Sequence, residues 1–420
     1  MILRGIVLFR SQLKLQRALL AIMLLASFLG VNCAANYDLD SRLRKIAKPY
    51  TFSIVKWELN AFFDGARKTL TGLEKITGKD IQKVIQFNSN VERIRALKSE
   101  IELTRAGSRQ GGLSLLEEEL EDFQLQNMEF EGVVEFTLER QIREVLFQEG
   151  IFNPVDKHLK IKIGFPPINF ELEMPPHLLV ISPRDRIDRI RGYVLRQVMT
   201  KEEMENIEAL ADELNVSSLV IELGGFAGTY PSFVTNEADL RFIIDTAAEE
   251  WLHHYLAFKP LGFQYSLHLI GILPDYEIAT INETVAGIVS TEIGADVYKK
   301  YYEQDEKKAK AEVAGTGFDF NREMRNIRRA VDNYLSRGEI DNAEEFMEQR
   351  RQFLADNGYY IRKLNQAYFA FHGVYADKPT SISPIGTELK ALRSRSGSLK
   401  QFLKTAAAMT SRQDLIDSLK

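Results

Sequence analysis

The residues best suited to chemistry form a cluster in one periodic stretch of the chain, at Glu249, Glu250 and His253. On a helix, Glu249 and His253 lie one turn apart and point the same way, with Glu250 beside them. Zinc catalysis uses this layout: two ligands from one rigid helix, a third from elsewhere, and an open position for a water that a neighbouring carboxylate deprotonates. Glu283, in a second periodic stretch, is the candidate third ligand. These residues predict a divalent metal site.

Two helices must position these groups. The first is predicted over residues 236–256, where apolar residues recur at helical spacing and Asn236 with Asp239 resembles an N-terminal cap. The second is predicted over residues 281–302. Small residues let two helices approach closely, and along this second helix Glu283 is followed on the same face by Gly287, Ser290 and Gly294. We expect this face to hold Glu283 against the first helix.

The stretch EEWLHHYL, followed by NETVAG, resembles the gluzincin class of zinc metallopeptidases, the thermolysin and aminopeptidase type. In that class one helix carries HExxH and a following helix supplies a glutamate. The resemblance spans roughly residues 155–300. It implies Glu249, His253 and Glu283 as metal ligands and Glu250 as the general base. The sequence departs from the class twice, because a glutamate replaces the first histidine and the gap to Glu283 is longer than usual. The EEWLH core also resembles an uncharacterised bacterial membrane-protein family.

The resemblance implies a peptide or protein substrate and further site residues. An extended peptide would pair with the strand predicted at residues 217–223, before a glycine-rich exit at residues 224–231. Tyr368 or His372, on a predicted C-terminal helix, would stabilise the oxyanion, with aromatic core packing as the alternative. Zinc is the expected metal. Two carboxylate ligands make the site harder than two histidines would, so manganese or iron becomes more competitive.

Other interpretations of the motif remain open at this point. Glu249, Glu250 and His253 could form a solvated acidic face of a helix. The pair Glu250 and His253 also matches half of a di-iron carboxylate site, which needs a four-helix bundle. A third possibility is a catalytically inactive protein with the same fold, acting as a membrane-tethered scaffold. His254 falls within the apolar arc, which indicates a packed, hydrogen-bonded histidine.

Composition excludes several classes of function. The chain has 420 residues, a formal net charge of −5 and a pI near 5.9, and it offers no basic patch for nucleic acid. Cys33 is the single cysteine, so an intramolecular disulfide and a cysteine-based metal site are both excluded.

The N-terminus predicts a membrane anchor. Four basic residues precede an apolar run of 18 residues, Ala18–Ala35, which lies at the lower limit for a membrane-spanning helix. A cleaved signal peptide and a lipid anchor at Cys33 are the alternatives. In each case we expect the main domain outside the cytoplasm.

The sequence predicts an α+β, zincin-like fold with a small mixed sheet packed on the motif helices. The expected parts are a signal-anchor at residues 1–35, a helical region at 36–150, the zincin-like domain at 151–302, a C-terminal helical domain at 303–392 and a tail at 393–420. Strands are predicted at residues 159–165, 168–173, 178–181 and 217–223, and a helix at 184–214. Three helices are predicted within residues 318–371.

Overall fold

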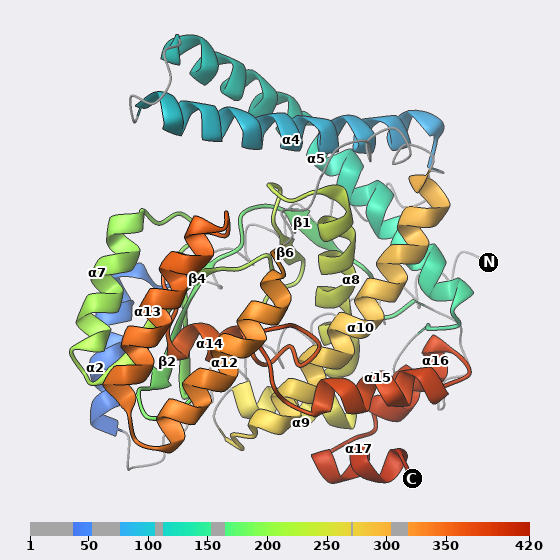
Figure 1. Cartoon of the computed structure of the whole chain (residues 1–420). Coiled ribbons are helices and arrows are strands. Elements are labelled where there is room, and N and C mark those ends of the chain that lie inside the picture. Colours follow the sequence, from blue (N-terminus) through green and yellow to red (C-terminus); the bar gives the residue numbers. More distant parts are fainter. Residues whose placement is uncertain (1–36, 53–75, 106–111, 153–163, 270–271, 304–317) are drawn as a thin grey trace.

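The computed structural model describes residues 37–52, 76–105, 112–152, 164–269, 272–303 and 318–420. This part of the chain is an α+β structure with two small three-stranded sheets set among helices (Figure 1). The α+β class and the helical N-terminal region predicted from the sequence are confirmed. In chain order the α-helices are α2 (Tyr37–Ala47), α4 (Gly78–Arg105), α5 (Leu113–Gln148), α7 (Lys201–Asp212), α8 (Leu240–Leu256), α9 (Pro260–Leu269), α10 (Tyr276–Tyr301), α12 (Phe320–Ser336), α13 (Ile340–Asp356), α14 (Gln366–His372), α15 (Ile385–Arg395), α16 (Leu399–Ala406) and α17 (Arg412–Ser418).

Helices α4 and α5 form an antiparallel hairpin that projects from the body at the top of Figure 1. Arg93 on α4 binds the carboxylate of Glu119 on α5 through two nitrogens, at 2.8 and 2.9 Å. The second half of α5 then runs down into the body beside α10. There the hydroxyl of Tyr302 donates to Gln141 Oε1 at 2.7 Å. The hairpin is therefore anchored to the helix that carries Glu283.

Two sheets lie between the helices. The first is antiparallel, in the order β3-β2-β4, and consists of β2 (His177–Pro183), β3 (Arg191–Leu195) and β4 (Val216–Glu222). The second has the order β1-β6-β5, with β1 (Phe170–Leu172) parallel to β6 (Ser232–Val234) and β5 (Gly225–Phe226) antiparallel to it. The strands predicted at residues 168–173, 178–181 and 217–223 are confirmed. The strand predicted at 159–165 lies largely outside the described residues.

The prediction of a helix over residues 184–214 is wrong for the first half of this segment. Residues 191–195 form β3, which pairs with β2 in antiparallel register, and helix α7 begins only at Lys201. Thr200 starts α7, because its side chain accepts a hydrogen bond from the backbone N–H of Glu203, and the Glu203 side chain accepts one from the N–H of Thr200. Residues 184–190 form the loop between β2 and β3, and pairing with the buried strand β2 decides the extended conformation of residues 191–195.

Both motif helices begin at an aspartate. The Asp239 side chain accepts from the backbone N–H of Phe242 at 2.9 Å and starts α8, whereas Asn236 instead donates to Glu131 on α5 at 3.0 Å. Helix α10 begins after Asp275, five residues earlier than predicted from the sequence. Glu283 consequently lies inside a continuous helix and not at its head.

The C-terminal helices complete the core around α8 and α10. Leu399, Phe402 and Leu415, from α16 and α17, are buried in the same hydrophobic cluster as the apolar faces of α8 and α10. The three helices predicted within residues 318–371 are confirmed as α12, α13 and α14. Gly338 and Gly358, which end α12 and α13, have φ angles of +75° and +86°, a conformation that glycine adopts without strain.

The sequence-based prediction of a single-pass membrane protein is corrected. Among the described residues no helix is both long and apolar enough to cross a bilayer, because the long helices carry charged side chains along their length. The apolar run at residues 18–35 lies outside the described residues. The membrane anchor and the extracytoplasmic main domain are not retained.

Candidate metal centre

Helix α8 presents two acidic groups and one histidine beside its buried face. Ile244, Ala247, Ala248 and Trp251 are buried in the core, whereas Glu249, Glu250 and His253 are only partly buried. The sequence produces this division because the apolar residues recur at i, i+3 and i+4 while Glu249 and His253 follow each other at i, i+4 on another face.

The predicted ligands converge. One ligand atom from each of Glu249, His253 and Glu283 lies within 4.8 Å of the ligand atoms of the other two, a group that could hold a metal ion. His253 Nε2 is 3.5 Å from Glu283 Oε2. The side chains of His253 and Glu283 are 15% and 10% exposed, so the group is largely buried but still touches solvent.

Close packing of α8 on α10 brings Glu283 to this position. At Gly294 a side chain would overlap the carboxylate of Asp245 on α8, so the residue must be small. Gly287, one turn after Glu283, faces open space. The predicted small-residue stripe therefore has two parts, of which one permits helix packing and the other leaves room beside the candidate ligand.

Two neighbours orient the candidate ligands. His253 Nδ1 lies 3.0 Å from Asn282 Oδ1, which fixes Nδ1 as the hydrogen-bond donor and leaves Nε2 directed to Glu283. The hydroxyl of Tyr265 donates to Glu283 Oε1. Tyr265 lies on α9, which occupies the segment between α8 and α10. The segment between His253 and Glu283 thus supplies a helix that contacts Glu283.

The buried charges act strongly on one another. Although burial favours the neutral imidazole, the carboxylates of Glu283, Glu250 and Glu249 raise the pKa of His253 to about 10. Burial opposes ionisation of Glu283, but His253 and Tyr265 stabilise its carboxylate more and lower its pKa to about 2. Burial, with a smaller contribution from Glu283, raises the pKa of Glu249 to about 7. A divalent cation among these groups would favour the carboxylates and displace the histidine proton.

Glu250 lies beneath the glycine-rich exit of β4. A side chain at Gly225 in β5 would overlap the Glu250 carboxylate, and the backbone N–H of Ala227 donates to it. Burial raises the pKa of Glu250 to about 8. His254 reaches the same segment, with Nε2 at 2.9 Å from the carbonyl oxygen of Ala227. His254 is 4% exposed, which confirms the prediction of a packed, hydrogen-bonded histidine.

The strand predicted to pair with a peptide is already covered. Strand β4 is at an edge of its sheet, but the outward N–H groups of Ser218 and Val220 donate to the side chains of Asp212 and Glu208, at 3.0 and 2.7 Å. Asn365 Nδ2 donates to the carbonyl of Ser218 at 2.8 Å. The prediction for residues 217–223 is therefore corrected, because their edge is occupied by side chains. Strand β5, at the edge of the other sheet, is the strand beside Glu250.

Tyr368 and His372 pack against each other on α14, with ring centroids 4.4 Å apart. Among the described residues no hydrogen bond or ring contact links either of them to the Glu249–His253–Glu283 group, and burial alone shifts their pKa values. Tyr375, just after α14, has a different environment. Burial and the charges of Glu283, Glu249 and Glu250 raise the pKa of Tyr375 well above its usual range, so Tyr375 is, after Tyr265, a second phenol on which these carboxylates act. Its position in a loop gave no periodic signal that could have identified it.

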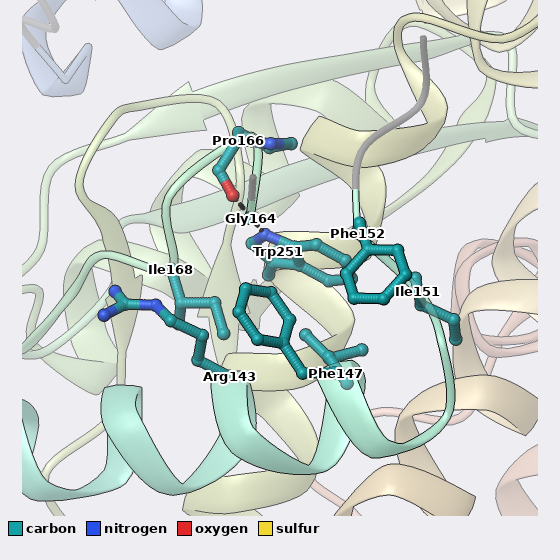
Figure 2. A pocket seen from close by; sticks show the side chains of 9 residues that line it. Arg143, Phe147, Ile151, Phe152, Gly164, Pro166, Ile168 and Trp251 are labelled. Atoms are coloured by element: carbon teal, nitrogen blue, oxygen red, sulfur yellow. Dashed lines mark hydrogen bonds between the residues drawn. The ribbon is translucent and has the colours of Figure 1, made fainter. Parts of the chain in front are cut away.

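The far side of α8 holds a small apolar cavity of about 10 Å³ (Figure 2). Trp251 Nε1 donates to the carbonyl of Pro166 at 2.7 Å beside it, and Phe147 of α5 closes it. This cavity is too small for a substrate and belongs to core packing. A di-iron arrangement needs a second set of carboxylates, and the described part of the chain contains one such metal-ligand group.

A scan against protein-family models, a search of curated proteins and a search of solved structures each found no match to this chain. The functional interpretation therefore rests on the geometry of the Glu249–His253–Glu283 group.

Proposed function

We propose that the protein is a metal-dependent hydrolase of the metallopeptidase type, with a divergent zincin-like core. Glu249, His253 and Glu283 would hold one divalent cation. The observation that carries this proposal is the convergence of three ligand atoms, from two helices, within 4.8 Å of one another. Three protein ligands with a fourth position left to solvent are the pattern of catalytic and not structural zinc sites.

The donor set fits such an ion. Asn282 holds the His253 ring so that Nε2 is directed at the group, and Tyr265 orients Glu283, the kind of support that metal ligands receive in other proteins. Two carboxylates and one imidazole accept zinc, and they also suit manganese or iron better than two imidazoles would.

When bound, the cation would act as a Lewis acid and lower the pKa of a coordinated water. Glu250 is placed to accept a proton from that water, because it lies beside both Glu249 and His253 on α8 and is partly buried beneath β5. The hydroxyl of Tyr375, which stays protonated, would donate a hydrogen bond to the developing oxyanion. The peptide substrate would lie along β5, whose backbone passes over Glu250.

A second candidate function is a catalytically inactive scaffold. It is favoured by the ion pair between His253 Nε2 and Glu283 Oε2 at 3.5 Å, because this pair neutralises both side chains without a metal. In that case the buried pair would contribute to the packing of α8 on α10 and the protein would bind a partner without turnover.

Glu250→Gln separates the two functions. In the hydrolase, this variant retains the metal and loses about 10²- to 10⁴-fold in the rate of hydrolysis of an unstructured protein such as casein. Glu222→Gln, at a side chain that is 72% exposed, is the matched control and should hydrolyse casein as fast as wild type. If Glu250→Gln hydrolysed casein as fast as wild type, Glu250 would not be the base. If the wild type contained no metal and were inactive, the hydrolase would be rejected and the scaffold function would remain.

A further inference from the structure

The glycine-rich exit of β4 lies along one side of α8. Phe242, Thr246 and Glu250 follow one another at intervals of four residues, so they form one row on that helix. A Cβ atom at Gly224 would lie 2.6 Å from the Phe242 ring. A Cβ atom at Gly225 would lie 2.5 Å from Cγ2 of Thr246 and would overlap Oε1 of Glu250. The backbone of this segment therefore rests directly on the row.

Hydrogen bonds to the backbone fix this segment on both sides of Gly225. The N–H of Thr235 donates to the carbonyl oxygen of Gly224 at 3.0 Å, next to the pairing of β5 with β6. On the other side, His254 Nε2 lies 2.9 Å from the carbonyl oxygen of Ala227. Because the strand is held at both ends, it does not withdraw from α8 to make room for a side chain at Gly225. The part that can move is the carboxylate beneath it, the end of a flexible side chain.

Contact, and not backbone conformation, requires a glycine at position 225. The φ angle of Gly225 lies outside the left-handed region, so its backbone would accept alanine. The adjacent Gly224 has a different neighbour, because the Phe242 ring is 43% exposed and can turn toward solvent. Of these two glycines, Gly225 is the one that meets the candidate base.

We propose that Gly225 is a positioning residue for the base, because its missing side chain lets β5 hold the Glu250 carboxylate in one place beside the Glu249–His253–Glu283 group. This inference rests on the proposed function. A general base must lie within hydrogen-bond reach of the proton that it accepts. A misplacement of about 1 Å can cost roughly 10²-fold in rate. A methyl group at Gly225 displaces the carboxylate and leaves the three candidate ligands where they are.

The first measurement is a double-mutant cycle on stability, made on the zinc-free full chain so that it does not depend on activity. Every chain carries Thr246→Ser, which removes Cγ2, the second atom that a side chain at Gly225 would meet. Gly225→Ala should lower the urea midpoint, because a methyl group is forced against the carboxylate. In the Glu250→Asp background, where the carboxylate is one methylene shorter, this decrease should shrink by about half or more. Gly224→Ala, the matched control, should change the midpoint equally in both backgrounds.

The second measurement is the hydrolysis of casein by the zinc-loaded chains. Gly225→Ala should lower kcat about 10²-fold with KM and zinc content unchanged, because the base is displaced while substrate binding is not disturbed. Gly224→Ala should retain most of kcat, since the exposed Phe242 ring can turn away.

The outcomes separate this inference from the proposed function. If Gly225→Ala changed the urea midpoint equally in both backgrounds, Gly225 would not act through Glu250, and the inference would be overturned whether or not the protein is an enzyme. A wild-type kcat in Gly225→Ala, with Glu250→Gln slow, would also overturn it and leave the proposed function standing. If Glu250→Gln were as fast as wild type, or the wild type were inactive, the proposed base would fail and the positioning role with it.

Discussion

The hydroxyl of Tyr265 on α9 donates a hydrogen bond to Oε1 of Glu283 on α10, while the Tyr265 ring stacks on His253 of α8. One side chain thus contacts two of the three candidate ligands and joins three helices at the group. Burial and the negative charge of Glu283 raise the pKa of Tyr265 well above its usual range, so the hydroxyl stays protonated and remains a donor.

Tyr265→Phe should weaken metal binding. It removes the hydrogen bond that orients Glu283 and keeps the ring stacked on His253, and loss of such a supporting contact typically costs about 10- to 100-fold in metal affinity. Competition with a fluorescent zinc chelator measures the dissociation constant. Tyr334→Phe on α12, remote from the group, is the control and should bind zinc as wild type does. Unchanged affinity in Tyr265→Phe would show that the hydroxyl does not support the ligand.

Replacing two glycines of α10 by alanine should change the free energy of unfolding in opposite directions. A side chain at Gly294 overlaps the Asp245 carboxylate and disturbs its 2.8 Å pair with Arg241, so Gly294→Ala should lower the free energy of unfolding by about 1–3 kcal/mol. Gly287 faces open space within a helix, so Gly287→Ala should raise it by about 0.5–1 kcal/mol. Urea denaturation of the two variants measures both changes. A destabilising Gly287→Ala would contradict the open space beside Glu283.

Stability should fall in acid because of His254. Burial lowers the pKa of His254 to about 4, from an ordinary value of 6.5, so the unfolded chain binds the proton more readily than the folded protein. The neutral His254 side chain makes its full contribution to the free energy of unfolding above about pH 6.5. This contribution is lost as the pH falls toward 4, with a total loss of about 3 kcal/mol. Denaturation of wild type and His254→Gln between pH 4 and 7.5 isolates this contribution, because the glutamine does not titrate. The difference in unfolding free energy between the two should change with pH, and a constant difference would reject the role of His254.

Much of the site could be predicted because the periodicity of apolar residues alone assigns each residue of a helix to a face. The apolar stripe of α8 determines which residues are buried, and Glu249 and His253 must then share another face. The small residues of α10 likewise predicted close approach at Gly294.

Other features depend on contacts between distant segments, which a single sequence does not reveal. Pairing with β2 makes residues 191–195 a strand within a segment predicted to be helical, and side chains from α7 and Asn365 cover the edge of β4. Tyr265 contacts the group from a short helix, where no spacing rule connects it to His253. Tyr375, on which the charges of the group act, lies in a loop. Tyr368, predicted from its place on a helix, packs against His372 instead.

Elemental analysis of the purified full chain shows whether Glu249, His253 and Glu283 hold one divalent cation. We expect about one zinc, manganese or iron per chain, less than about a tenth of that in His253→Ala and Glu283→Ala, and full content in Glu222→Gln. A metal-free wild type, or unchanged metal content in His253→Ala and Glu283→Ala, would contradict it.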